Sequence, residues 1–408
     1  MRISSGAIYE TNVSSLNQQQ GKLLHTQQQV ASGRRVLTPA DDPFASARAL
    51  EVSQSDAANT QFTTNRNAAK HSTAMAESIL QSVTSLLQDV RTATVGDGSG
   101  VLTTPDKKAL AEDLNGRLEE LIGLANSTDG LGNYLFSGYQ GRTLPFVKSA
   151  SGIYYAADDG QRKIQVDSSR QLATSDSGAD IFMRIKNGNG KFSFDASINN
   201  TGSGISSQGA VSDNALLTGH NYKIIFNVNQ DEGLSRTSYD IVDTNTDEVL
   251  SEDNDYASGR VINFDGIQLD ISGEPGDQDE FYVTPSKNES LFKTLSDLIG
   301  ALKSENPLGG NAAKAQYTNS VNRALNNIDR GLENVSTIRT SLGSRLRELD
   351  ALQVTGEDVG LQYKGKLSEL QDVDLNKAIS DLNQEQTSLT AAQKSFKQVS
   401  DLSLFNYL

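Results

Sequence analysis

The residues whose spacing comes closest to a chemical site are Asp243, Asn245 and Asp247, which fit the first three ligand positions of an EF-hand calcium loop. That loop also needs a glycine at its sixth position and a glutamate at its twelfth. Here those positions hold Glu248 and Asn254. Because clusters of Asp and Asn more often form turns, we expect a turn at this place and no bound metal.

Other catalytic groups have no supporting pattern. The three histidines, His25, His71 and His220, do not form the His-Glu-x-x-His motif of a zinc protease. The chain contains no cysteine, which excludes a thiolate nucleophile, a cysteine metal site and a disulfide. It also lacks a P-loop and a Gly-x-Ser-x-Gly motif. We therefore expect no catalytic residues, no cofactor and no enzymatic activity.

Charge is distributed unevenly along the 408 residues. The net charge of −15 argues against a nucleic-acid partner. Residues 170–286 hold 7 Lys or Arg and 19 Asp or Glu, so this block alone carries −12. Residues 1–40 carry +3 and residues 373–408 carry −1, so repulsion does not prevent the two ends from packing together. No run is apolar enough for a membrane span or a cleaved signal peptide, so we expect any export to use another route.

Both ends of the chain show a narrow apolar stripe with a period of seven residues. The N-terminal stripe consists of Leu16, Leu23 and Val30. The C-terminal stripe and the apolar terminus that follows it consist of Leu375, Leu382, Leu389, Phe396, Val399, Leu402, Leu404 and Phe405. Stripes this narrow bury too little to stabilise isolated helices, so we expect both to complete their packing against neighbouring subunits. The alternative is an ordinary antiparallel bundle whose ends are buried within one chain.

The segments between the ends change from helix to strand and back to helix. Gly33 is placed to end the first helix, and Asp42 with Pro43 is placed to begin a long second helix. We expect a flexible Ser/Gly/Asn loop at 197–209. The segments that we expect to be strands are 221–228, 237–242, 261–271 and 280–284.

These elements predict a multidomain α+β protein. In it, the N- and C-terminal segments form a long antiparallel helical rod, and the middle of the chain forms a β-rich insertion domain. The expected parts are a terminal coiled-coil region (1–40 and 373–408), a helical rod domain with β-hairpins (41–170 and 285–372) and a β-rich outer domain (171–284).

Three separated segments carry a family resemblance: residues 31–50 (ASGRRVLTPADDPFASARAL), residues 132–146 (GNYLFSGYQGRTLPF) and residues 373–408. They resemble the flagellin superfamily and, within it, the hook-associated protein 3 family of hook-filament junction proteins. The residues that match the family motif are Gly33, Asp41, Asp42, Pro43, Phe136, Ser137 and Gly138. The central block is covered less well and looks expanded relative to short relatives.

The resemblance implies a structural subunit of the bacterial flagellum, exported without a cleaved signal peptide and located outside the cell. It implies self-assembly in the axial structure, on hook-associated protein 1 and below flagellin. It also implies a cytoplasmic export chaperone that covers the C-terminal helix, so the terminal stripes would contact the chaperone first and the assembly later. No nucleic acid or membrane partner is expected.

Two alternatives remain open from the sequence. The chain is also similar to filament flagellin, although its Asp-Asp-Pro motif and its Leu-Phe-Asn-Tyr-Leu ending speak against that assignment. The second alternative is a rod that carries an adhesin or glycan-binding outer domain. Its candidate aromatic contacts are Tyr222, Tyr239, Tyr256 and Tyr282, although their place in strands favours packing as their role.

Overall fold

The computed structural model describes residues 5–97, 103–231, 234–304 and 310–401. The chain forms two compact bodies. We call Met1–Arg66 with Ala351–Leu408 the terminal body, and Asn67–Asp350 the central body. The boundaries of the three parts expected from the sequence stay predictions.

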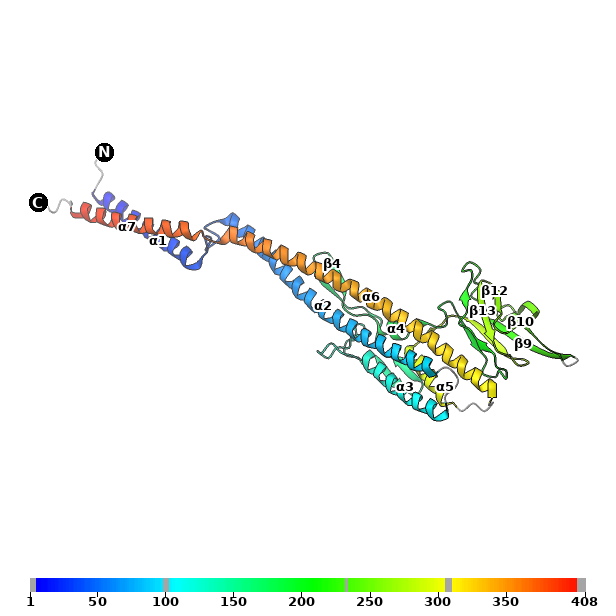
Figure 1. Cartoon of the computed structure of the whole chain (residues 1–408). Helices are drawn as coiled ribbons and strands as arrows, with labels where there is room; N and C mark the ends of the chain where they lie inside the picture. The colour runs from blue at the N-terminus through cyan, green and yellow to red at the C-terminus, as the bar shows by residue number, and fades with distance from the viewer. Residues whose placement is uncertain (1–4, 98–102, 232–233, 305–309, 402–408) are drawn as a thin grey trace. The chain divides into compact units, whose positions relative to one another are not determined.

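Two pairs of antiparallel helices join the beginning of the chain to its end (Figure 1). Helix α1 (Ser5–Ser32) lies beside α7 (Leu375–Asp401) in the terminal body. Helices α2 (Pro43–Asp97) and α6 (Gly310–Gln371) contribute residues to both bodies. Their antiparallel register follows from ion pairs in the central body, in which Lys70 Nζ lies 2.6 Å from an Asp350 carboxylate oxygen and Arg91 Nε lies 2.7 Å from one of Asp329.

Two shorter helices complete the helical part of the central body. Helix α3 (Thr104–Ala125) begins with a capping box, in which Thr103 and Asp106 exchange hydrogen bonds with each other's backbone. Helix α5 (Leu291–Lys303) packs along α3, and the Ser290 hydroxyl accepts a hydrogen bond from Lys293 N at its start. The core that they form with α2 and α6 contains fully buried leucines and isoleucines, among them Leu80, Leu87, Leu114, Leu121, Leu295 and Ile328.

Short strand pairs and one short helix lie on either side of the β-rich region in the sequence, between α3 and β6 and between β14 and α5. Their bounds are β1 (Phe146–Ser149), β2 (Gly152–Tyr155), β3 (Lys163–Asp167), β4 (Arg170–Ala173), α4 (Gly178–Phe182), β5 (Ile185–Lys186) and β15 (Asn288–Glu289). Phe146 and Phe182 are buried in the helical core, so these hairpins are anchored by aromatic packing.

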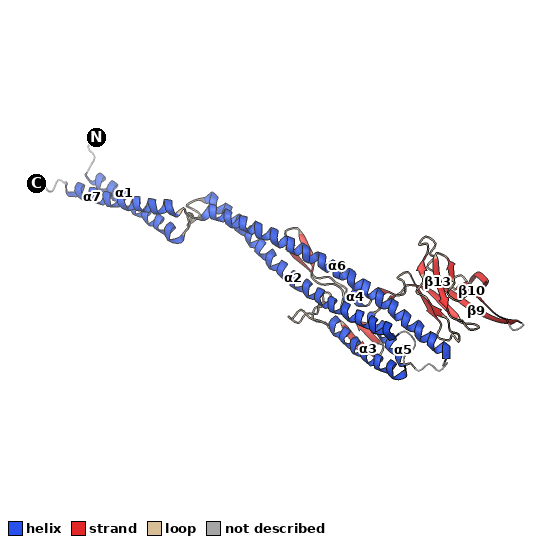
Figure 2. Cartoon of the chain, viewed as in Figure 1, coloured by secondary structure: helices blue, strands red, loops and turns tan. Residues whose placement is uncertain are grey.

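The remaining strands form a β-rich region with its own core (Figure 2). One sheet has the strand order β11-β10-β9-β14-β6, and a second has the order β12-β13-β7, with β8 also pairing with β13. The bounds are β6 (Phe192–Ala196), β7 (Ile205–Ser206), β8 (Ala210–Val211), β9 (Tyr222–Asp231), β10 (Leu234–Asp243), β11 (Glu248–Asp255), β12 (Val261–Phe264), β13 (Ile267–Ser272) and β14 (Glu280–Pro285). All strand pairs are antiparallel. Long N- and C-terminal helices around a central antiparallel β-rich region confirm the predicted fold class.

The segment at 197–209 is the main local correction. Asp279 accepts hydrogen bonds from Thr201 N (2.7 Å) and Gly202 N (2.9 Å), and Ser206 N donates to Asn319 Oδ1 at 2.9 Å. Ser206 is buried and belongs to β7. The expectation of a flexible loop was therefore wrong, because long-range partners satisfy the backbone of this Ser/Gly/Asn tract.

Candidate assembly interface

The terminal stripes meet along the α1–α7 pair. The rings of Tyr9 and Phe396 lie with their centroids 5.3 Å apart at one end of the pair. At the other end, Val373 N donates a hydrogen bond to Gly33 O at 3.0 Å. We call the contact between these two helices the seam, and the helices carry the predicted stripe residues Leu16, Leu23, Val30, Leu382, Leu389 and Phe396.

This seam is only partly covered within one chain. Each of those six stripe residues is half-buried. Among the described side chains of α1 and α7, only Thr26 and Ala378 are buried. Two helices in contact can cover only one face of each other, so the remaining apolar surface stays in contact with water.

Four large apolar side chains of this pair are strongly exposed. Tyr9 is 56% exposed, Leu24 56%, Leu375 50% and Ile379 48%. Of these, the sequence analysis named only Leu375. Leu24 and Ile379 lie off the seven-residue stripes, whereas Tyr9 lies seven residues before Leu16 and extends the N-terminal stripe. The side chain of Val399 and the residues Leu402, Leu404 and Phe405 lie outside the described part of the structure. The assignment of all these residues to an assembly or chaperone interface stays a prediction.

The first half of the family motif forms the joint between α1 and α2. Gly33 has a φ of +72°, which suits the left-handed residue that ends a helix. Asp42 caps α2, because its Oδ1 accepts a hydrogen bond from Ala45 N at 2.9 Å and Pro43 occupies the first helical position. Asp41 Oδ2 accepts hydrogen bonds from the backbone of Leu37 and Thr38, at 3.0 and 2.7 Å.

Backbone hydrogen-bond donors and one arginine lower the pKa values of these two carboxylates. The hydrogen bond from Thr38 N is the main cause that lowers the pKa of Asp41, and the hydrogen bond from Ala45 N lowers the pKa of Asp42. The Arg35 guanidinium, 3.1 Å from Asp42 Oδ2, lowers the pKa of Asp42 further. Both groups are therefore ionised near neutral pH and act as structural anchors of the turn.

Arg35 also ties the turn to the end of α6. Its Nη2 donates to Leu370 O at 2.9 Å, and its backbone N donates to Gln371 O at 2.7 Å. The arginine therefore joins the α1–α2 turn to the α6–α7 turn, so the terminal helices start from a fixed junction.

The second half of the motif lies in the central body. Phe136 and Ser137 are buried, and Gly138 has a φ of +63°. A Cβ atom at Gly138 would lie 2.2 Å from Asp158 O, so only glycine fits there. Asp158 in turn accepts hydrogen bonds from Tyr139 N and Gln140 N, at 2.9 and 3.0 Å.

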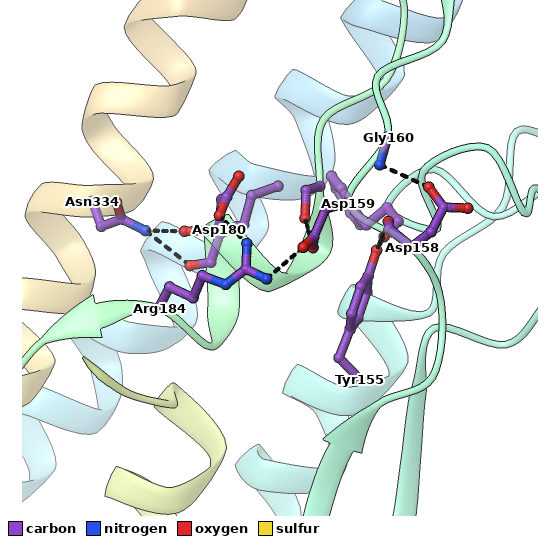
Figure 3. A network of polar contacts seen from close by, with 10 residues as sticks. Tyr155, Asp158, Asp159, Gly160, Asp180, Arg184 and Asn334 are labelled. Carbon is purple, nitrogen blue, oxygen red and sulfur yellow. Dashed lines mark hydrogen bonds and ion pairs between the residues drawn. The ribbon is translucent and has the colours of Figure 1, made fainter. Parts of the chain in front are cut away.

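This turn continues into a polar network that reaches α6 (Figure 3). The Tyr155 hydroxyl donates to Asp158 O at 2.7 Å. Arg184 pairs with Asp159 and lowers the pKa of that carboxyl. Asn334 Nδ2 of α6 donates to the carbonyls of Asp180 and Ile181, at 2.9 and 3.0 Å. The groups of the motif therefore position elements, because they cap a helix, fix turns and fill the core.

The candidate calcium residues form the turn of the β10–β11 hairpin. Asp243 Oδ1 accepts a hydrogen bond from Asn245 N at 2.8 Å, and its other oxygen contacts His220 Nδ1. Asp247 takes a left-handed φ of 58°. Within the described residues, no group of three acidic, histidine or cysteine side chains is arranged to hold a metal. These residues follow the turn interpretation.

The candidate glycan tyrosines are occupied by packing. Tyr222 is buried and contacts Phe264, while Tyr239 and Tyr256 pack against Phe226. Tyr282 is half-buried, and its hydroxyl donates to a Glu280 carboxylate oxygen. None of the four presents an exposed ring, which removes the aromatic platform that a glycan site usually uses.

The comparisons with known proteins agree with this geometry. Residues 3–141 match the family described as Bacterial flagellin N-terminal helical region, so this N-terminal part of the chain is similar to flagellins. Over its whole length the chain is similar to proteins named Flagellar hook-associated protein 3. It is 28% identical to the one from Salmonella typhimurium (strain LT2) over 408 residues, and 28% identical to the one from Escherichia coli (strain K12) over 409 residues. Each alignment covers 99% of this chain and 99% of the relative. The resemblance expected from the sequence motifs is thereby confirmed.

Solved structures show the same likeness. A hook-associated protein 3 from Legionella pneumophila superposes with a TM-score of 0.73 at 29% identity, over 78% of this chain and 98% of that one. FlgL from Xanthomonas campestris gives 0.71 at 27%, over 78% and 99%. Because the two curated relatives match over 99% of their own length, the central block is not expanded relative to them.

Proposed function

We propose that this chain is a structural subunit of the bacterial flagellum that joins the hook to the filament and assembles through α1 and α7. The observation that carries the proposal is the incomplete α1–α7 seam: six of its seven described stripe residues are half-buried, and the seventh, Leu375, is 50% exposed. A subunit whose terminal helices lack part of their apolar partner gains that surface when identical or related helices pack around it.

The partners follow from the same surface. The chain would assemble on hook-associated protein 1, carry flagellin above it and pack against copies of itself. Before export, a cytoplasmic chaperone would cover the C-terminal helix, where Leu375 and Ile379 are about half exposed. The assembled protein would lie outside the cell. It would be exported through the flagellar export channel, without a cleaved signal peptide. Within the described residues, no helix has the length and apolarity needed to cross a membrane.

The proposed role is mechanical and requires no catalysis. The ionised groups of the motif are used for caps and turns, and the buried aromatics are used for packing. Filament flagellin remains the nearest alternative, and the full-length similarity to hook-associated protein 3 favours the junction. Long homopolymers from the purified chain would favour the filament.

Leu389→Asp tests the proposal. We expect the variant to fold in its central body but to fail at the junction, because a carboxylate enters a seam that assembly buries. Ser388→Asp is the matched control, since it places the same charge on the exposed neighbour of the same helix. In a strain lacking this gene, the control should restore swimming, whereas Leu389→Asp should leave hooks without filaments and flagellin in the medium. Normal swimming with Leu389→Asp would refute the proposed interface.

A further inference from the structure

One basic residue is buried between α2 and α6 in the terminal body. Among the described Lys and Arg residues only Arg66 is buried, with an exposed fraction of 3%. It belongs to a series of buried positions on α2 that recur every seven residues and consist of Leu87, Leu80, Thr73 and Arg66. A helix seam usually places an apolar side chain at such a position, so the charge interrupts the apolar series.

A glycine of α6 makes room for this side chain. The buried residues that recur every seven positions on α6 are Val321, Ile328, Val335, Leu342 and Leu349. Gly356 is the next position of this series and is also buried. A Cβ atom at Gly356 would lie 2.1 Å from Arg66 Nη2, so the guanidinium occupies the space that a side chain would fill.

Hydrogen bonds join the residues of what we call the Arg66 layer, namely Asn59, Thr63, Arg66, Gln353 and Gly356. Arg66 Nε donates to Gln353 Oε1 at 3.1 Å, and Arg66 Nη2 donates to Thr63 Oγ1 at 2.8 Å. Asn59 Nδ2 donates to Gly356 O at 2.8 Å. All five residues belong to the terminal body. Because water competes for such bonds when the helices open, they hold the pair less firmly than an apolar layer of the same size.

Apolar packing is sparse beyond this layer. On the N-terminal side of the layer, the buried residues of α2 are Ala45, Ala49 and Val52. On α6, Gly356 is the only buried residue among the described positions from 350 to 371. Alanine and glycine bury little surface, so the hydrophobic stabilisation of the pair falls at the layer.

Helix propensity is low at the same place. Gly356, Gly360 and Gly365 fall within ten residues of the 62-residue helix α6. A Cβ atom at Gly360 would lie 3.1 Å from Asn59 Nδ2, whereas nothing lies within 4 Å of one at Gly365. Packing therefore accounts for Gly356 but not for Gly365. Each glycine lowers the stability of the helix relative to alanine.

We propose that the Arg66 layer is a weak point built into the α2–α6 pair. The stable core ends at the layer, so the outer segments 43–65 and 357–371 open and close while the central body stays folded. The inference rests on the proposed function only for the use of this opening. A junction subunit can then adjust the segments that lead into α1 and α7 to its neighbours without unfolding the central body.

Amide hydrogen exchange of the full chain tests the weak point. In the unsubstituted chain, the amides of 357–371 should exchange at least about tenfold faster than those of 335–349, with an abrupt change at the layer. Arg66→Leu combined with Gly356→Ala fills the layer with apolar groups and should slow exchange in 357–371 by at least about tenfold. Gly356→Ala alone should speed exchange there, because the new Cβ atom displaces Arg66 Nη2 from Thr63.

Two further glycines provide a matched control. Gly365 and Gly343 both lie in α6, and nothing lies within 4 Å of an added Cβ atom at either position. Gly365→Ala should slow exchange in 357–371, whereas Gly343→Ala should leave that segment unchanged. Leu389→Asp should leave the abrupt change in place, so a loss of assembly in that variant concerns only the α1–α7 interface.

Three results would overturn the proposal. One is a smooth decline of protection along α6 without an abrupt change at Gly356. Another is slower exchange in Gly356→Ala alone, because helix propensity would then explain the double variant as well. The third is normal swimming of a deletion strain that carries the double variant, since we expect the filled layer to reduce swimming although α1 and α7 are unaltered.

Discussion

A comparison of two leucine truncations tests whether the α1–α7 seam is complete in one chain. Leu121 of α3 is fully buried, whereas Leu389 of α7 is half-buried. Truncation of a buried leucine to alanine costs about 2–5 kcal/mol, because it combines the lost transfer free energy with a cavity. For Leu389, three carbon groups at about 0.8 kcal/mol each, of which at most about a third is already exposed to water, give roughly 2 kcal/mol without the cost of a full cavity.

The two variants should therefore separate stability from assembly. Leu121→Ala should lower the melting temperature of the central body by roughly 6–12 °C, since about 3 kcal/mol corresponds to about 2–4 °C per kcal/mol in a body of this size. Leu389→Ala should leave that transition within about 1 °C, yet it should reduce swimming in the deletion strain, because assembly buries the rest of its side chain.

Calorimetry of the purified chain and soft-agar swimming measure the two quantities. A Leu389→Ala chain that swims normally would show that no further surface of that residue is buried on assembly. A melting shift as large as that of Leu121→Ala would show that α7 is already packed as a core helix. Either result would refute the reasoning for an incomplete seam.

Two further predictions concern the family motif. Gly138→Ala should destabilise the central body by more than Gly130→Ala. Both glycines have a positive φ, which costs alanine about 1–2 kcal/mol, but only at Gly138 would the new Cβ lie 2.2 Å from a backbone oxygen, because nothing lies within 4 Å at Gly130. Equal free energies of unfolding of the two variants, measured by denaturant titration, would contradict this. The lowered pKa of Asp42 means that its contribution to stability is complete above its ordinary value of 3.8 and is lost as the pH falls through the lower value of the folded state. Asp42→Asn should therefore remove that acid dependence of unfolding while keeping the cap, and Asp42→Ala should remove both; the same acid dependence in Asp42→Asn would show that another group is responsible.

Much of the helical architecture is predictable because its signals are local. The seven-residue spacing of Leu382, Leu389 and Phe396 is visible in the sequence, all three are half-buried on α7, and Phe396 contacts Tyr9 of α1. Gly33 ends α1 because its backbone takes a left-handed φ, and Asp42 caps α2 because its side chain accepts a backbone hydrogen bond. Both roles were predicted from the residue types. Such features depend on residues within one or two helical turns.

The features that the sequence analysis missed depend on distant partners. Strand β11 was not predicted, because its Asp and Glu residues have low strand propensity and it forms only by pairing with β10. The run at 261–271 was read without a break, although Asp265 and Gly266 take positive φ and make it the β12–β13 hairpin. An Asp-Gly pair between alternating apolar residues was the signal for that turn.

In the candidate interface, too, the features that the sequence analysis missed are those that depend on distant parts of the chain. Leu24 and Ile379 fall outside the heptad stripes, and their exposure appears only once the two helices are placed against each other. The contact of Arg35 with Leu370 spans 335 residues, so no local pattern reports it.

Amide hydrogen exchange of the free full-length chain tests the central claim most directly. If α1 and α7 lack part of their apolar partner, their backbone amides should exchange much faster than those of α5, whose leucines are buried. The account predicts fast exchange across residues 5–32 and 375–401 beside slow exchange across 291–303. Comparable protection in all three segments would mean that the terminal helices are stable without neighbours, and it would contradict assembly through an incomplete seam.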